Sequence, residues 1–291
     1  MITIGLAAYG NLNTTKSAIN AIKKSIKEDF EIILVDDHSP DNGKIKEYFL
    51  SLKNDFQQIK VFSFQENLGY THSVNCILSN SICEKILFVS NDIFINEYFI
   101  NELVNISSLI QNVGYVRGVS NFVDGYLDTH NVNFKGKSYE DSVTFAKKQY
   151  LLEKNNFYEE KYLTGDCFLI NKKLIKEIGY FDYFNFKDYF GDVDFSIRAM
   201  KSNFKCLLSK GAFCYHDKHV NFNYLTAKEK ERKIFRRRYF TIEDWARFKI
   251  KYDLPNNLMY PGINKIDFEN IKKKSLKKSY IKNLDYSEYL I

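Results

Sequence analysis

Polar residues directly follow three of the predicted strands. They are Tyr9 and Asn11 after the first strand, Asp36 and Asp37 after the second, and Asn91 and Asp92 after the fourth. Because ligands of open parallel sheets bind outside the carboxyl ends of the strands, we expect these side chains to share one site. The other interpretation is that Asp and Asn make turns or cap the next helix, and we favour it for Asp41.

Asp92 is the clearest candidate for a metal ligand. It stands in an otherwise apolar stretch, KILFVSNDIFI, where a carboxylate needs a partner. A divalent cation is a natural partner, because such cations prefer oxygen ligands. His216 lies at the end of a later predicted strand. A single histidine there is usually structural, but together with Asp92 it is a candidate second ligand.

Two more acids, Asp192 and Asp194, open a predicted helix within a dense aromatic and acidic segment, residues 179–200. Acids in the first turn of a helix interact favourably with the helix dipole. This structural explanation and a functional one carry equal weight on the residues alone.

The first 120 residues alternate between two apolar patterns. Apolar runs predict strands at 2–9, 31–35, 59–64, 85–89 and 113–119, and apolar residues at helical spacing lie between them. Strands separated by helical patterns indicate βαβ units. The predicted fold is therefore α/β, with a mostly parallel central sheet flanked by helices.

The regular pattern fails in residues 122–161, which we interpret as an insertion or lid. Helical spacing returns near 174–178 and 192–201, and residues 204–214 are predicted to form a strand pair. Helix signals continue from residue 227 onward. We therefore expect one domain over residues 1–225, made of a regular half (1–120) and a second half (121–225) that contains the insertion, followed by a helical, basic C-terminal extension (226–291).

Composition excludes several classes. The chain has 291 residues, of which 45% are hydrophobic and 27% charged, which is typical of a folded protein. It carries no G-x-G-x-x-G and no G-x-x-x-x-G-K-[ST] motif, which argues against a dinucleotide dehydrogenase or a P-loop NTPase. Its five cysteines are odd in number and form no C-x-x-C, so we expect reduced thiols. With no signal peptide and no apolar run of about 18 residues, we expect a cytoplasmic protein.

Positive charge is concentrated at the C-terminal end. Residues 228–291 hold 17 Lys and Arg against 9 Asp and Glu, a net charge of +8 within a chain of +6. Such a segment favours an anionic partner, for which we consider the inner face of a membrane. A nucleic-acid partner is not expected, because no nucleic-acid-binding motif accompanies the charge.

Several segments, in this order along the chain, resemble the family two glycosyltransferases of the GT-A fold, especially those that extend bacterial surface polysaccharides. The segments are ITIGLAAYGN at the start, ILVDDHSPDN (33–42), ENLGYTHSVN (66–75), VSNDIFI (89–95), and LTGDCFLINKKLIKEIGYFD followed by GDVDFSIRA. The resemblance covers residues 2–220 and implies an inverting sugar transfer from a nucleotide-diphospho-sugar, with UDP as the expected nucleotide, to a saccharide or lipid-linked saccharide acceptor.

The resemblance also implies that residues 1–120 are the nucleotide-sugar half and residues 121–225 the acceptor half, and it implies roles for individual residues. The nucleotide would be contacted by Ala7, Tyr9, Asp36, Asp37, Asn67 and Asn91. Mn²⁺ or Mg²⁺ would be bound by Asp92 and His216. Asp192 would be the general base, and the acceptor would lie near Gly165, Asp166 and Asp194.

Two positions depart from the family pattern. The D-x-D motif is reduced to Ser90-Asn91-Asp92, so only one carboxylate is supplied. At the position where the family has a Glu before the general base, this chain has Gly191. Asp188 or Asp194 is a candidate replacement.

Two alternative functions remain: a non-catalytic nucleotide-sugar-binding relative and a nucleotidyltransferase. The extension 226–291 is a candidate membrane or oligomer contact.

Overall fold

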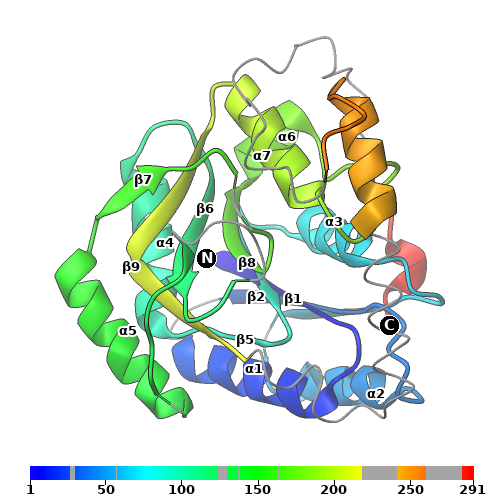
Figure 1. The fold of residues 1–291 in the computed structure, drawn as a ribbon. Coiled ribbons are helices and arrows are strands. Elements are labelled where there is room, and N and C mark those ends of the chain that lie inside the picture. Colours follow the sequence, from blue (N-terminus) through cyan, green and yellow to red (C-terminus); the bar gives the residue numbers. More distant parts are fainter. Residues whose placement is uncertain are drawn as a thin grey trace.

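The computed structural model describes residues 1–26, 30–56, 58–123, 130–136, 138–162, 164–217, 241–259 and 284–291. Within these residues the chain forms a nine-stranded sheet with helices on both faces (Figure 1). Within the basic segment 228–291, residues 228–240 and 260–283 lie outside the described residues.

The N-terminal half alternates strand and helix as the sequence predicts. Its elements are β1 (Ile2–Ala8), α1 (Leu12–Ser25), β2 (Phe30–Asp36), α2 (Lys44–Ser51), η1 (Leu52–Asn54), β3 (Ile59–Ser63), α3 (Tyr70–Asn80), β4 (Lys85–Ser90), β5 (Ile93–Phe94), α4 (Glu97–Leu109) and β6 (Val113–Ser120). The strands are apolar and buried because both faces of the sheet are covered.

The second half adds α5 (Tyr139–Glu153), β7 (Phe157–Glu159), β8 (Cys167–Asn171), α6 (Lys172–Ile178), α7 (Gly191–Lys201) and β9 (Lys205–His216). The predicted insertion thus contains a 15-residue helix and a short strand. Among the described side chains of α5 only Ser142 and Ala146 are buried, which explains why the sequence showed no helical stripe there. The predicted strand pair at 204–214 was wrong: these residues lie in one strand, β9, with an irregular register beside Gly118.

The sheet order is β3-β2-β1-β4-β8-β6-β9-β5, and β7 also pairs with β9. The strands β3, β2, β1 and β4 are parallel. The next strand, β8, is antiparallel to both β4 and β6, and β9 is parallel to β6. Six strands therefore run in one direction, and β8, β5 and β7 run in the other. The predicted α/β fold with a mostly parallel sheet is confirmed.

Two apolar clusters fill the two faces of the sheet, and a third holds the C-terminal segment. Residues 241–251 form a helix whose Trp245 and Phe248 pack on Phe190 at ring-centroid distances of 5.3 and 5.5 Å. At the chain end, the Ile291 N–H donates to the Val61 carbonyl on β3, which is an edge strand. The described parts of the predicted extension therefore pack against the body of the protein.

Candidate active site

The polar residues of the sequence analysis gather at one edge of the sheet. Strands β1, β2, β4, β6 and β9 all end there, and β8, which runs the other way, begins there. The Ser90 N–H at the end of β4 donates to the Asp166 carbonyl just before β8, with an N···O distance of 2.9 Å. This connection brings Asp166 beside the D-x-D-like segment.

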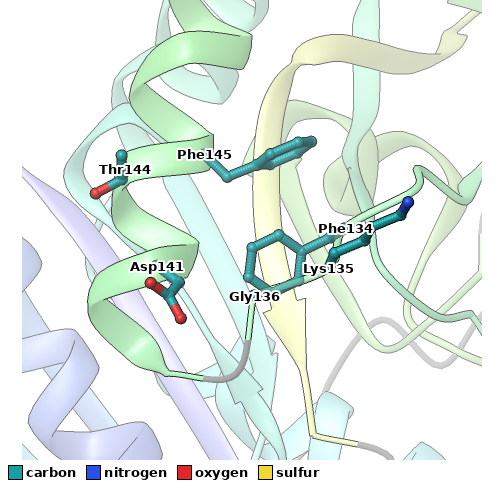
Figure 2. A pocket seen from close by; sticks show the side chains of 6 residues that line it. All are labelled: Phe134, Lys135, Gly136, Asp141, Thr144 and Phe145. Atoms are coloured by element: carbon teal, nitrogen blue, oxygen red, sulfur yellow. The ribbon is translucent and has the colours of Figure 1, made fainter.

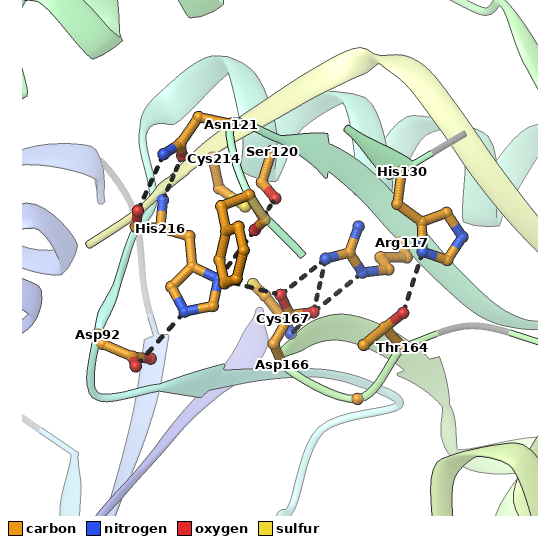
Figure 3. A network of polar contacts seen from close by, with 12 residues as sticks. Asp92, Arg117, Ser120, Asn121, His130, Thr164, Asp166, Cys167, Cys214 and His216 are labelled. Atoms are coloured by element: carbon orange, nitrogen blue, oxygen red, sulfur yellow. Dashed lines mark hydrogen bonds and ion pairs between the residues drawn. The ribbon is translucent and has the colours of Figure 1, made fainter. Parts of the chain in front are cut away.

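Asp92 and His216 face each other at this edge (Figure 3). The pairing of Ile93 with His216 places them together, and His216 Nε2 lies 3.4 Å from Asp92 Oδ2. His216 Nδ1 lies 2.9 Å from the Phe122 carbonyl oxygen, which accepts only if Nδ1 carries the proton. This contact leaves Nε2 as the nitrogen directed at Asp92. Burial lowers the pKa of His216, but Asp92, Asp166 and the Phe122 carbonyl outweigh burial and raise it to about 9.

These two side chains fit a divalent cation that shares its shell with a substrate. Within the part of the chain that the structure describes, no group of three or more His, Cys, Asp or Glu side chains could hold a metal ion by itself. A carboxylate and an imidazole with its other nitrogen committed to a carbonyl form a suitable partial ligand set. Mg²⁺ and similar ions typically take one or two protein carboxylates and complete the shell with substrate phosphates and water.

Asp192 lies in the first turn of α7, where the sequence predicts the start of a helix. Its Oδ2 accepts from the Gly165 N–H at 2.8 Å, and its Oδ1 accepts from its neighbour's N–H, that of Val193, at 2.9 Å. Burial raises the pKa of Asp192 to about 6, although these N–H donors lower it and the charge of Asp166 adds to the rise. A carboxylate with a pKa near 6 is suited to take a proton at neutral pH.

The turn of Thr164, Gly165 and Asp166 lies between the Asp92–His216 pair and Asp192. Gly165 holds Asp192 from one side, and the Tyr70 hydroxyl donates to the Gly165 carbonyl at 2.7 Å from the other. A Cβ at Gly165 would lie 2.1 Å from the Tyr70 oxygen, so no larger residue fits this contact. The structure therefore places Gly165 and Asp166 between the two halves of the site.

Asp166 is bound by a buried arginine that the sequence analysis did not identify. Arg117 on β6 is 1% exposed, and its Nε and Nη2 donate to the Asp166 carboxylate at 2.6–3.0 Å (Figure 3). Asp166 Oδ2 also lies 3.7 Å from His216 Nδ1. The only sequence signal for Arg117 is a cation inside the apolar run VGYVRGV, which requires an anionic partner.

The residues expected to contact a nucleotide form a second group of contacts. Asp37 is 4% exposed and accepts from the side-chain amide of Asn67 at 2.7 Å and from the N–H groups of Leu68 and Gly69. Burial raises the pKa of Asp37 to about 7, against the lowering effect of these N–H donors. The carboxylate thus fixes the loop before α3.

The remaining predicted nucleotide contacts surround the ends of β1 and β4. Asp36 Oδ1 accepts from the Ser39 N–H at 3.0 Å. The Asn91 amide donates to the Gly10 carbonyl at 3.0 Å and to Thr15 Oγ1 at 2.9 Å, so it joins the D-x-D-like segment to the start of α1. Ala7 is partly buried, and Tyr9 is 43% exposed.

Asp194 does not lie where an acceptor could contact it. Its side chain is fully buried and accepts from Arg198 Nε at 2.8 Å and from the Tyr252 hydroxyl at 2.6 Å, and Lys251 forms an ion pair with it. These cations overcome the effect of burial and lower the pKa of Asp194. Its expected acceptor contact is therefore corrected: Asp194 anchors the helix 241–251 to α7.

Asp188 lies closer to the site than Asp194. Its Oδ1 accepts from the Tyr70 N–H at 3.2 Å, at the start of α3. Its own N–H donates to Asp244 in the C-terminal helix. Asp188 thus supports Tyr70, whose hydroxyl donates to the Gly165 carbonyl, and the Gly165 N–H in turn donates to Asp192.

A shallow hollow of about 530 Å³ lies beside α5 (Figure 2). It is lined by Phe134, Lys135, Gly136, Asp141, Thr144 and Phe145. The Phe134 ring is 5.6 Å from the ring of Tyr215, the neighbour of His216 in β9. The predicted insertion therefore forms a partly aromatic surface next to the strand that ends in the site.

Two further predictions can be compared with the structure. All five cysteines are buried and free, as expected for reduced thiols. In the described ranges, no helix has the length and apolar character needed to cross a membrane.

Three solved structures share the fold of this chain. A mannosyltransferase from Pyrobaculum calidifontis, in complex with GDP-Man and Mn²⁺, superposes with a TM-score of 0.59 at 13% identity, over 94% of this chain and 71% of that one. The TarS fragment 1–349 of S. aureus gives 0.53 at 18% identity, over 74% of this chain and 60% of the fragment. GalNAc-T7 with UDP, GalNAc and Mn²⁺ gives a TM-score of 0.55 at 14% identity, over 74% of this chain and 43% of that one.

The chain thus spans less than two thirds of the length of the TarS fragment and of GalNAc-T7. At these identities the likeness shows the fold, which is the GT-A fold. No curated protein matches the chain significantly in sequence. Residues 3–179, more than half of the chain, match the family described as glycosyl transferase family 2. The chain is therefore a member of glycosyl transferase family 2.

Proposed function

We propose that this protein transfers a sugar from a nucleotide-diphospho-sugar, with UDP as the expected nucleotide, to a hydroxyl of a saccharide acceptor, with inversion at the anomeric carbon. The observation that carries the proposal is the separation of two groups at one sheet edge. Asp92 and His216 form a pair on one side, and Asp192, with a pKa of about 6, lies on the other side of the Gly165 turn.

Asp192 acts as the general base in this proposal. The acceptor hydroxyl attacks the anomeric carbon from the face opposite the diphosphate, and the bond between that carbon and the diphosphate oxygen breaks. The hydroxyl proton passes to a carboxylate oxygen of Asp192, which Gly165 and Val193 hold in place. Proton transfer of this kind contributes about 10²–10⁴-fold to a rate.

Asp92 Oδ and His216 Nε2 would hold Mn²⁺ or Mg²⁺. The ion would act as a Lewis acid that stabilises the charge on the departing diphosphate. Two of the similar structures contain Mn²⁺ together with a nucleotide or nucleotide-sugar, which supports this part of the proposal. Asn91, the middle residue of the D-x-D-like segment, fixes the segment to α1 through its amide, and Ser90 stands where the first acid would be.

The nucleoside would lie over the ends of β1 and β2. Tyr9 offers a partly exposed ring, and Ala7 leaves space beside it. Asp36 and Asp37 would border the ribose and base, with Asn67 and the Leu68 N–H fixing the direction of Asp37. We expect the acceptor near Gly165 and Asp166, with the aromatic hollow of Phe134 and Phe145 as a surface for its further sugar rings.

The biological setting belongs to the same proposal. We place the enzyme in the synthesis of a bacterial surface glycan, in the cytoplasm. The basic segment 228–291 would contact an anionic membrane face or another subunit. Co-sedimentation with anionic vesicles at low and high salt tests the membrane contact, which is contradicted if the full-length protein stays in the supernatant at low salt.

A panel of nucleotide-sugars tests the proposed reaction. Each donor is incubated with the full-length protein with Mn²⁺, with Mg²⁺ and with EDTA, and nucleotide release is measured by chromatography. We expect slow release from a UDP-sugar that requires the metal. A protein that binds donors but releases no nucleotide from any of them would instead support the non-catalytic alternative.

A further inference from the structure

We infer that Arg117 is a positioning residue for the metal pair, acting through Asp166. The inference rests on the proposed function. It extends that function to Arg117, which lies outside both the D-x-D-like segment and the segment that carries Asp192. Arg117 lies on β6, two strands away from β4, and its side chain is among the largest fully buried ones in the described chain. Burying a guanidinium is costly unless a carboxylate and hydrogen bonds compensate for it.

The contacts of Arg117 are arranged to fix one carboxylate. Nε and Nη2 donate to both Asp166 oxygens at 2.6–3.0 Å, and Nη1 donates to the Gly118 carbonyl at 2.6 Å. A planar fork on two oxygens restricts both the position and the rotation of the carboxylate. Asp166 Oδ1 also accepts from the Cys167 N–H at 3.0 Å. Asp166 therefore has one orientation, set by Arg117 and the start of β8.

That orientation directs Asp166 Oδ2 toward His216 Nδ1, at 3.7 Å. The same nitrogen faces the Phe122 carbonyl at 2.9 Å. The Phe122 carbonyl accepts the Nδ1 proton, and the Asp166 carboxylate adds an electrostatic contact on the same side, so that Nε2 is presented to Asp92. Metal-binding histidines commonly rely on such a contact at their second nitrogen, and its loss typically costs about 10- to 100-fold in metal affinity or activity.

Two more contacts make Asp166 an appropriate place for this control. Its carbonyl accepts from the Ser90 N–H, in the segment that carries Asp92. Its neighbour Gly165 holds Asp192. A displacement of Asp166 would therefore move both supposed metal ligands, and Asp192 with them. The structure assigns Arg117 as the residue that prevents this displacement.

Arg117→Met and Asp166→Asn test the inference, with Arg198→Met as the matched control. Arg198 is also a buried arginine, 6% exposed, with an aspartate partner at 2.8 Å, but its pair lies on α7 away from His216. Mn²⁺ affinity in the presence of UDP is measured by calorimetry, and thermal unfolding is recorded for each protein. We expect both Arg117→Met and Arg198→Met to lower the melting temperature, but only Arg117→Met and Asp166→Asn to weaken Mn²⁺ binding, by about 10- to 100-fold.

A double variant separates positioning from simple loss of stability. This variant combines Arg117→Met with Asp166→Asn. If Arg117 acts through Asp166, its Mn²⁺ affinity is no lower than that of the single variant with the lower affinity. Arg117→Lys keeps the charge without the planar fork and serves where Arg117→Met does not fold; we expect it to weaken Mn²⁺ binding as well. Unchanged Mn²⁺ affinity in folded Arg117→Lys and Asp166→Asn would overturn the inference. Absence of UDP-dependent Mn²⁺ binding in the unaltered protein would instead overturn the proposed function.

Discussion

Replacing Asp192 with asparagine isolates the proposed proton transfer from binding and folding. The side chains are nearly equal in size, but asparagine cannot take a proton from the attacking hydroxyl. We expect Asp192→Asn to lower kcat by roughly 10²-fold or more while the Kd of the donor stays within about threefold. The two carboxylate oxygens of Asp192 accept from the N–H groups of Gly165 and Val193. Asparagine has only one side-chain oxygen, so it keeps only one of these two hydrogen bonds.

The effect on stability can be worked out from the pKa. The pKa of Asp192 is about 6 in the folded protein and 3.8 as the reference value. Ionisation therefore opposes folding: the cost is absent below pH 3.8, develops up to pH 6 and is complete above it, at about 3 kcal/mol. Asparagine removes this cost and loses one hydrogen bond worth about 1 kcal/mol. We expect the free energy of unfolding at pH 7.5 to change little or to rise by up to about 2 kcal/mol.

The same pKa sets the pH dependence of the unaltered enzyme. The base must be ionised, so the rate is expected to fall about tenfold per pH unit below pH 6 and to level off above it. Metal-dependent nucleotide release from the donor, in which water takes the place of the acceptor, is measured from pH 5 to pH 8 at constant ionic strength. Asp192→Asn should lose both the rate and the acid limb of this profile.

Asp194→Asn on the same helix is the control. It should be less stable, but its folded fraction should keep the acid limb near pH 6. A normal rate in Asp192→Asn, or a flat profile from pH 5 to pH 8 in the unaltered enzyme, would refute the assignment of Asp192 as the base.

Three more changes test other parts of the site. Asp92→Ala should reduce UDP affinity measured with Mn²⁺ by calorimetry to the value measured without it, and an unchanged metal dependence would contradict its role. Gly165→Ala places a Cβ 2.1 Å from the Tyr70 oxygen and should lower nucleotide release at least tenfold; adding Tyr70→Phe should recover part of the rate, and no recovery would argue against this contact. Asp194→Asn leaves buried Arg198 and Lys251 short of an anion, which costs about 3 kcal/mol and should lower the Tm by roughly 5–10 °C. Because the pKa of Asp194 is lowered in the folded protein, its contribution is present above pH 3.8 and lost as the pH falls through that lowered value, so Tm differences between the two proteins should shrink in acid.

The sequence by itself determined the elements and the general place of the site. Apolar runs specify β1, β2, β3, β4 and β6, and helical spacing specifies the helices between them, because burial on both faces of a sheet requires that pattern; the two-residue strand β5 was not predicted. Asp36, Asn91 and Asp92 follow such runs, so their arrival at one sheet edge follows from parallel strand direction alone. The pattern was silent for α5, since that helix buries very little of its surface.

Only the tertiary structure decided which side chains meet. Asp92 and His216 pair because β9 lies antiparallel to β5, and Arg117 reaches Asp166 because β8 enters between β4 and β6 in the reverse direction. Such contacts depend on strand order, which local patterns do not encode. Asp192 and Asp194 look equivalent in the sequence, yet two residues of helix rotate the side chain by about 200°. One of them therefore faces the Gly165 turn, and the other is buried against Arg198 and the C-terminal helix.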